Sequence, residues 1–438
     1  MPMEEIVMVC CSDIAGQVRG KGMPAKLLQR RRDRGVGWTP TNIMITAHGP
    51  IADSPWGSFG DLMLVPDLDT HVRIDFEDDE AAEQFVLGDI RQPDGTPWDC
   101  CLRNFLRRGL ERLREESGLT LKAAFEHEFH YDGVDEQPNA PYNLDAYRRQ
   151  GSFAETLLHA LESAGLETDT FMAEYGPCQY EVTVAPAVGI RAADNAVILR
   201  ELARACAFRL GARASFAPIL RPGAVGNGVH LHFSLLEAES GQPVNHDPAQ
   251  AHGIAQRAGA FVAGILGKLP ALTALTAAST ISYQRLVPHR WSAAFNNLGL
   301  HDREAAVRVC PVFETAGIDT AAQFHFEFRA ADAAASPYIL LGALVWAGLD
   351  GLRRGLDTPS PTEEDLSALS AADLSDRGFV RLPQSLEEAL ERLAADDDIK
   401  DWMGPTLHDA YLRHKRFENE LLSALSPEEQ CARYLQVY

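Results

Sequence analysis

Polar and apolar side chains alternate along residues 124–131, where Glu126 and Glu128 stand two positions apart. Residues two apart in an extended strand point to the same face of a sheet. The pattern therefore predicts a strand that presents both carboxylates to one space and packs Phe125 and Phe129 behind it. Close carboxylates repel each other, so burying both of them requires a cation.

The same alternation returns in three later segments. Their polar members are His230, His232 and Ser234 in residues 226–234, His325, Glu327 and Arg329 in residues 324–329, and Glu174 and Glu181 on either side of a Gly-Pro turn. One such strand is most simply half-buried with a solvated outer face. Four strands that each set Glu or His opposite an unusually apolar face predict one curved sheet whose polar face lines a cation-filled cleft.

Residues 1–95 predict a small β-rich domain, because short apolar or β-branched runs alternate there with Gly, Pro and Asp. The expected strands are residues 6–11, 41–47, 61–65 and 70–75. Residues 96–438 predict an α/β catalytic domain in which helices separate the polar-faced strands.

Three helices are expected before the second half of the chain, and their ends carry recognisable signals. They are a helix that Gly118 ends, a helix that a capping box at Ser152 opens and Gly165 ends, and a helix over residues 192–210. The chain is expected to be helical and acidic from Thr362 onward, with Asp396 to Asp398 as a solvated loop.

The net charge of −22 over 438 residues argues against nucleic acid or an anionic membrane as a partner. We expect no signal peptide and no apolar stretch of transmembrane length. The eight cysteines are scattered, which favours reduced, buried thiols and a cytoplasmic location. Cys178 stands between Glu174 and Glu181, and packing is preferred to chemistry as its role.

Hard oxygen ligands with one imidazole suit Mg²⁺ or Mn²⁺ better than zinc. Four arginines accompany the later polar strands, namely Arg285, Arg303, Arg308 and Arg329. Guanidinium groups match phosphate and carboxylate oxygens. Divalent metals and arginines around one anionic cleft are typical of phosphoryl transfer.

Several motifs together resemble, in order and spacing, those of the glutamine synthetase superfamily. They are residues 13–21, 126–129, 174–181, 228–234, 285–288, 303–308 and 327–329. The resemblance covers nearly the whole chain. It implies an α+β fold, with a β-grasp-like domain at 1–95 and a catalytic domain at 96–438 built on a curved antiparallel sheet of the glutamine synthetase and guanido kinase type.

The resemblance also implies an activity, an ATP-dependent carboxylate-amine ligase. ATP converts the γ-carboxylate of glutamate to an acyl phosphate, and an amine then displaces phosphate. Two or more Mg²⁺ or Mn²⁺ ions would serve each site. Glu128, Glu174 and Glu181 would hold one metal, and Glu126, His230 and Glu327 the other.

The remaining site residues also follow from the resemblance. ATP would contact His232, Ser234, Arg303 and Arg308; glutamate would contact Gly226, Gly228, Arg285 and Arg329; and Arg285, Arg303, Arg329 and Glu327 would act in catalysis. Family members form homo-oligomers, so we expect a dodecamer of two stacked hexameric rings with active sites shared between subunits.

The chain departs from the family at the site of the attacking amine. Ammonia-using members carry a flap glutamate about where this chain has Trp291, beside His289. Asp53 is only an uncertain counterpart of the aspartate that helps to deprotonate ammonium, and Val225 replaces an asparagine of the glutamate site. An amine pocket of Asp53, His289 and Trp291 therefore favours an organic amine and a γ-glutamylamide or γ-glutamylpolyamine synthetase.

Other functions stay open at this point. One alternative is a true glutamine synthetase that uses ammonia, and another is a catalytically silent structural or sensing relative. Alkyl, hydroxyalkyl, polyamine and aryl amines cannot be ranked, although a polyamine would need more acidic lining than these segments contain.

Overall fold

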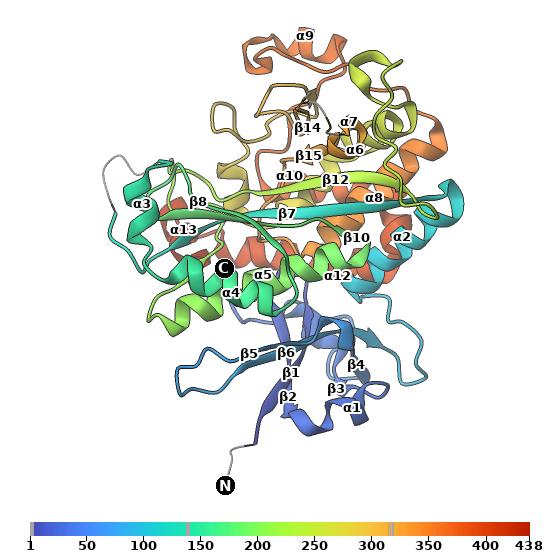
Figure 1. Cartoon of the computed structure of the whole chain (residues 1–438). Helices are drawn as coiled ribbons and strands as arrows, with labels where there is room; N and C mark the ends of the chain where they lie inside the picture. The colour runs from blue at the N-terminus through green and yellow to red at the C-terminus, as the bar shows by residue number, and fades with distance from the viewer. Residues whose placement is uncertain (1–3, 137–140, 314, 316, 318) are drawn as a thin grey trace.

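The computed structural model describes residues 4–136, 141–313, 315, 317 and 319–438. Two β-sheets organise the chain, and the N-terminal one lies below the other in Figure 1. The lower sheet has six strands in the order β2-β1-β6-β4-β3, with β5 also paired to β6. Their bounds are β1 Ile6–Ser12, β2 Val18–Pro24, β3 Val36–Trp38, β4 Leu62–Pro66, β5 Val72–Ile74 and β6 Glu83–Arg91. The helix α1 (Leu28–Arg31) belongs to the same part of the chain.

One expected strand of this part is wrong. Residues 40–44 form a 3-10 helix instead of the strand predicted over 41–47. Pro40 occupies its first turn, where a fixed φ and a missing N–H suit the start of a helix. The other predicted strands are present, within a few residues of their expected ends.

The second sheet has nine strands in the order β13-β14-β15-β12-β7-β9-β8, with β10 and β11 also paired to β7. Their bounds are β7 Leu119–Tyr131, β8 Thr168–Ala173, β9 Gln179–Val184, β10 Ala187–Val188, β11 Ala214–Ser215, β12 Val229–Glu237, β13 Leu298–Gly299, β14 Val307–Val309 and β15 Phe326–Phe328. Every pairing is antiparallel except β13 with β14. The predicted sheet of polar-faced strands is therefore confirmed.

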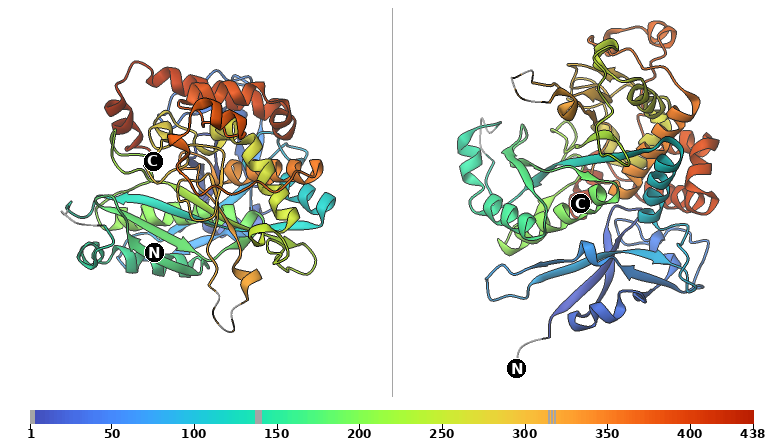
Figure 2. Two further views of the ribbon diagram at one scale, coloured as in Figure 1. Left: turned by 90° about the horizontal axis from the view of Figure 1, so that it is seen from above. Right: turned by 45° about the vertical axis from the view of Figure 1, so that its right-hand side comes forward.

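Helices cover the apolar face and one end of this sheet. Their bounds are α2 Leu102–Ser117, α3 Leu144–Arg149, α4 Phe153–Ser163, α5 Ile190–Arg209, α6 Gln256–Thr276, α7 Thr320–Gln323, α8 Pro337–Arg354, α9 Ala371–Asp376, α10 Leu386–Ala395, α11 Asp397–Met403, α12 Pro405–Leu422 and α13 Pro427–Tyr434. Figure 1 shows α4 and α5 below β7, between it and the N-terminal sheet, and Figure 2 shows the same layering from two further sides. One hydrophobic core runs through both sheets and most of these helices, and α13 packs in a separate, smaller cluster.

Two details of the predicted helix ends need correction. Ser152 precedes α4, but its side chain makes no capping bond, and Gln150 Oε1 accepts the N–H of Ala154 instead at 2.7 Å. Asp396 to Asp398 are not a solvated loop, because Asp396 caps α11 and both Asp396 and Asp398 pair with Lys268.

The expectation that no apolar stretch reaches transmembrane length is wrong for one helix. Residues Gln256–Thr276 are long and apolar enough to cross a membrane, but 78% of their most apolar window is buried inside the protein. This helix, α6, packs against α8 and α10, as a core helix does.

Candidate active site

The strand register sets the candidate ligands opposite one another on the polar face of the sheet. Glu126 on β7 pairs with His230 on β12, and Glu128 on β7 pairs with Glu181 on β9. On the far side of β12, His232 pairs with Glu327 of β15. Alternation along β7 is complete, since every second residue from Leu119 to Tyr131 is buried.

Short distances connect these side chains. Glu126 Oε1 lies 3.0 Å from His230 Nδ1, which is 3.6 Å from Glu327 Oε1. The other ring nitrogen, His230 Nε2, lies 4.0 Å from Glu128 Oε1. His230 therefore stands among Glu126, Glu327 and Glu128, of which Glu128 belongs to the other predicted ligand set.

The carboxylates are more crowded than their local cations can neutralise. Burial, together with the charges of Glu126 and Glu128, raises the pKa of Glu181 to about 11. Burial and the neighbouring Glu128 also raise the pKa of Glu174. Burial opposes ionisation of Glu126 as well, but hydrogen bonds with His230 and His232 outweigh it and hold the pKa of Glu126 well below its usual range. A carboxyl group that burial and its neighbours' charges keep protonated fits a site for a divalent cation with hard oxygen ligands.

The loop before β12 closes against this cluster. The N–H of Gly228 donates to Glu128 Oε2 at 2.7 Å. A Cβ at Gly226 would lie 2.5 Å from Cγ of Arg285, so glycine is needed for this close approach. Gln179 Nε2 holds the loop by donating to Gly226 O and to Asn227 Oδ1, each at 2.9 Å. Sequence reasoning missed this role of Gln179, although it directly precedes the Tyr180-Glu181 pair of the motif.

Three of the four predicted arginines reach the site. Arg308 Nε lies 3.0 Å from Glu327 Oε2, and Arg329 pairs with the other oxygen of Glu327. Arg285 Nη1 donates to Ser292 Oγ at 2.9 Å and is buried. Arg303 is exposed on the loop before β14, so the structure does not bring it into this cluster.

The flap of residues 288–292 contains no acidic residue, but an acid from elsewhere holds it. Glu304 Oε2 accepts the N–H of His289 and Glu304 Oε1 accepts the N–H of Trp291, each at 2.9 Å. Both flap residues have positive φ, 61° and 53°, which is uncommon outside glycine. The Trp291 carbonyl accepts from Arg329 Nη2 at 3.1 Å, while its side chain is 66% exposed. Glu304 follows Arg303 in the sequence, and nothing there signalled its contact with the flap.

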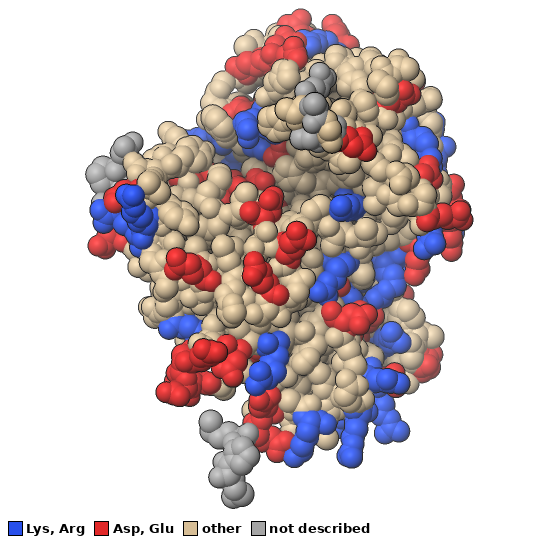
Figure 3. Space-filling model, in the orientation of Figure 1, with Lys and Arg blue, Asp and Glu red and all other residues tan. Residues whose placement is uncertain are grey.

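One cavity adjoins the cluster, and another lies beside the flap. The first has a volume of about 550 Å³ and is lined by Glu126, His232, Ser234 and His325 among others, which is the side that the resemblance gives to ATP. The other, of about 520 Å³, lies beside the flap and includes His289. Its acidic lining residues are Asp302, Glu304, Glu363, Glu364 and Asp365. Figure 3 shows this face of the molecule hollowed in its middle, with acidic and basic side chains at the edge.

Asp53 lies apart from the other predicted amine-pocket residues. Its side chain is 83% exposed, and Oδ2 accepts from Arg413 Nη1 at 2.7 Å. Cys178 is buried, its thiol donates to Val134 O at 3.4 Å, and burial raises its pKa to about 11. Packing is therefore the better account of Cys178.

Two known family models together match nearly the whole chain. The glutamine synthetase catalytic domain matches residues 99–434, and the glutamine synthetase N-terminal domain matches residues 2–98.

Individual proteins agree with the family match. A gamma-glutamylpolyamine synthetase of Streptomyces coelicolor is 34% identical over 443 residues, covering 99% of this chain and 93% of that protein. A glutamine synthetase of Thermotoga maritima is 29% identical over 384 residues, covering 86% and 85%. A crystal structure described as a novel glutamine synthase homolog superposes with a TM-score of 0.92 at 40% identity, covering 100% of this chain and 99% of that one.

Proposed function

The chain belongs to the glutamine synthetase family and is an ATP-dependent ligase, and we propose that it joins the γ-carboxylate of glutamate to an organic amine. The observation that carries the proposal is the flap. It contacts Arg329 through the Trp291 carbonyl, and it carries Trp291 and His289 where an ammonia-using enzyme needs a carboxylate to bind and deprotonate ammonium. Both oxygens of the nearest acid, Glu304, already accept backbone N–H groups.

Glu128, Glu174 and Glu181 are the residues that would hold one Mg²⁺ or Mn²⁺, and Glu126, His230 and Glu327 a second. Bound there, these ions would neutralise phosphate oxygens and stabilise the charge that develops during phosphoryl transfer. Their fit rests on the donor set, which is five carboxylates and one imidazole, and on the raised pKa of Glu181.

The arginines would hold the anionic substrates. Arg285, close to the Gly226–Gly228 loop, and Arg329 would orient the glutamate carboxylate or the transferred phosphoryl group. Arg308 would contact nucleotide phosphate from β14, and His232 and Ser234 would line the nucleotide cavity. Arg303 lies on an exposed loop next to Glu304. We still propose that it binds nucleotide phosphate and acts in catalysis.

Among organic amines, a polyamine has the best support. The cavity beside His289 carries five acidic residues in its lining, more than the flap segments alone contain. Trp291 adds a cation–π surface worth about 0.5–2 kcal/mol. The relative from Streptomyces coelicolor is named a gamma-glutamylpolyamine synthetase, which agrees with this choice. True glutamine synthesis remains the competing function.

The test is amide formation from ATP, glutamate and each of a polyamine, an alkylamine, a hydroxyalkylamine, an arylamine and ammonium at equal concentration. We expect the highest kcat/KM with the polyamine. Glu363→Gln should raise KM for the polyamine and leave KM for the alkylamine unchanged. This result would distinguish the contribution of the acidic cavity to amine binding from that of the flap. If ammonium gives the highest kcat/KM, the protein is a glutamine synthetase with an unusual flap and the proposal is wrong.

Assembly is part of the same proposal, because Asp53 is 83% exposed and pairs with Arg413 instead of the flap of its own subunit. We propose two stacked hexameric rings in which the N-terminal part of one subunit completes the site of the next. Asp53→Asn and Glu327→Ala should each be inactive alone, and their reassembled mixture should regain roughly a quarter of the wild-type activity. Sedimentation as a monomer or dimer, or an inactive mixture, would refute shared sites.

A further inference from the structure

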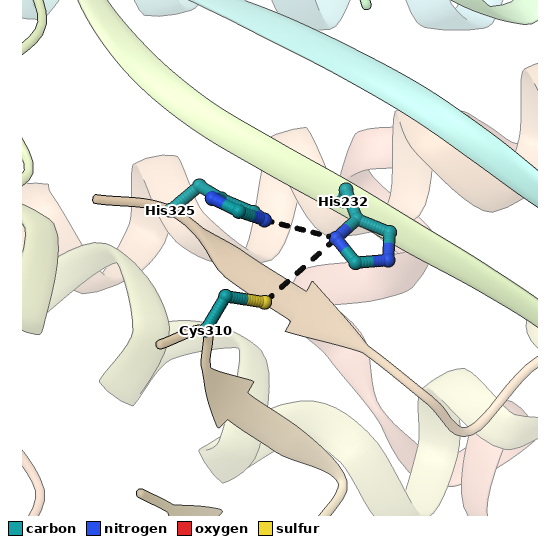
Figure 4. A group of neighbouring side chains, drawn as sticks. All are labelled: His232, Cys310 and His325. Carbon is teal, nitrogen blue, oxygen red and sulfur yellow. Dashed lines mark hydrogen bonds between the residues drawn. The ribbon is translucent and has the colours of Figure 1, made fainter. Parts of the chain in front are cut away.

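Three side chains from neighbouring strands converge beside the carboxylate cluster. They are His232 on β12, Cys310 directly after β14 and His325 directly before β15 (Figure 4). His232 Nδ1 lies 3.0 Å from His325 Nε2 and 3.7 Å from Cys310 Sγ. One nitrogen or sulfur from each residue lies within 4.8 Å of the others. Because β14, β15 and β12 are consecutive in the sheet, and the N–H of Cys310 donates to His325 O at 3.0 Å, the sheet fixes this geometry.

The remote nitrogen of each imidazole faces an oxygen acceptor. His325 Nδ1 lies 2.6 Å from the carbonyl oxygen of Gln323, which can only accept, so Nδ1 carries the proton and Nε2 has a free lone pair in the neutral ring. His232 Nε2 lies 3.2 Å from Glu126 Oε2. Histidines that bind metals almost always donate their other ring N–H to a carboxylate or a carbonyl in this way.

The spacing of the inner atoms also suits a metal. With Zn–N about 2.0–2.1 Å and Zn–S about 2.3 Å, a tetrahedral ion separates two nitrogens by about 3.3 Å and a nitrogen and a sulfur by about 3.6 Å. The observed separations from His232 Nδ1, 3.0 Å and 3.7 Å, are within a few tenths of these values. Both separations from His232 therefore suit ligands of one tetrahedral ion.

We propose that His232, Cys310 and His325 form a second, softer metal site that binds Zn²⁺ or a similar thiolate-preferring divalent ion. Two imidazoles and a thiolate select such ions, whereas the neighbouring carboxylates select Mg²⁺ or Mn²⁺. His232 and His325 line the cavity of about 550 Å³, so its fourth position is open to water or ligand. His232 joins the two sites, with Nδ1 toward the soft site and Nε2 toward Glu126.

Occupation of this site has a consequence for the enzyme. His232 lies in the cavity that we assign to ATP, so Zn²⁺ there should raise the apparent KM for ATP. This consequence rests on the proposed function, whereas the existence of the site does not.

The experiment titrates Co²⁺, as a spectroscopic substitute for Zn²⁺, into the full-length protein with its carboxylate sites saturated by Mg²⁺ and its thiols reduced by a phosphine. Thiolate-to-cobalt charge transfer in the near ultraviolet reports coordination by cysteine alone. We expect one equivalent of this absorption per chain, its absence in Cys310→Ser, and Zn²⁺ affinity lower by about tenfold or more in His325→Asn. Cys178→Ser is the matched control, since Cys178 is also buried and its thiol points to Val134 O.

The outcomes separate the alternatives. If the band is absent from the wild type, or survives in Cys310→Ser, the proposal is wrong and Co²⁺ binds only at the carboxylates or another thiol. Should Cys310→Ser fail to fold, as circular dichroism would show, His325→Asn decides, and unchanged Zn²⁺ affinity in that variant overturns the site. These measurements do not need turnover, so a failure of the amine-ligase proposal would leave them interpretable.

Discussion

At the scale of single residues, the site is defined by carboxylates that the protein alone cannot neutralise. Burial and the charges of Glu126 and Glu128 keep Glu181 protonated in the absence of metal, and Glu174 is pushed in the same direction. Holding these carboxylates close together and buried therefore costs free energy in the folded protein, and bound cations would offset that cost.

Glu128→Ala should therefore abolish ligase activity without unfolding the protein. We expect kcat to fall by roughly 10²-fold or more because a group that positions the metal is lost. The melting temperature of the metal-free variant should equal or exceed that of the metal-free wild type, since removing one carboxylate relieves repulsion. Mg²⁺ should raise the melting temperature of the wild type more than that of the variant. Unchanged turnover at saturating Mg²⁺ would refute the ligand assignment, and Glu327→Ala tests the second metal in the same way.

Glu304 is a positioning residue at the same scale, because it holds two backbone N–H groups of a flap in an uncommon conformation. Glu304→Ala should raise KM for the amine by about tenfold, because the flap loses two hydrogen bonds to a charged group and becomes less ordered. KM for ATP should not change. Steady-state kinetics with each substrate varied in turn measure the difference, and equal changes in both constants would mean that Glu304 supports the fold and not the flap.

At the scale of elements, helix α12 ties the C-terminal helices to the N-terminal part of the chain. His414 Nε2 lies 3.2 Å from Ile45 O, and the N–H of Ala47 donates to Glu418 Oε2 at 3.4 Å. Arg413 reaches Asp53 from the same helix. The loop that carries Asp53 is thus positioned by side chains from more than three hundred residues later.

The buried His414 predicts an acid sensitivity of stability. Burial and the nearby Lys415 lower its pKa from 6.5 to about 4. Between these values the unfolded chain binds a proton that the folded chain does not, so stability is lost as the pH falls from about 6.5 toward 4, on the order of 2–3 kcal/mol in all. His414→Gln can still donate to Ile45 O and should flatten this part of the pH dependence.

Melting temperatures at pH 7 and pH 5 measure the effect, with His159→Gln, an exposed histidine of α4, as the matched control. The control should keep the wild-type difference between the two pH values. If His414→Gln keeps it as well, His414 does not cause the acid sensitivity.

At the scale of the whole molecule, one buried arginine connects the N-terminal sheet to helices of the catalytic part. Arg103 on α2 binds Asp67 and Asp89 from the N-terminal part at 2.6 and 3.1 Å, and Asp194 of α5 at 2.9 Å. Tyr338 of α8 donates to the same Asp194 at 2.6 Å. The network lies where the N-terminal sheet meets helices of the catalytic part.

Arg103→Met should destabilise the protein by about 3–5 kcal/mol, because it leaves buried carboxylates without their cation. Arg353→Met is the control, because Arg353 pairs with Glu116 through two hydrogen bonds of 2.7 Å at the protein surface. Loss of this exposed pair should cost about 0–1 kcal/mol. Denaturant unfolding of both variants beside the wild type gives the comparison. Equal losses would mean that burial of the Arg103 network adds nothing to stability.

The sequence by itself determined much of the fold and of the candidate site. Alternation with a period of two placed Glu126 and Glu128 on one face of a strand, and the same pattern located the strands of His230 and Glu327. These are local properties of the backbone, so they can be read without knowing what packs against it. The order of the motifs likewise indicated the glutamine synthetase family, and the family match confirmed it. The roles of the individual site residues stay predictions.

The tertiary structure alone decided which side chains meet. The capture of the flap by Glu304, the approach of Cys310 and His325 to His232, and the Arg103 network all join segments whose separation in sequence carries no signal. The strand predicted at residues 41–47 is absent because a helical turn begins at Pro40. Helix α6 is buried by its neighbours, although its length and composition would also suit a membrane. Periodicity fixes the face on which a side chain lies, whereas sheet register, loop paths and helix packing fix its neighbours, and those depend on contacts across the whole chain.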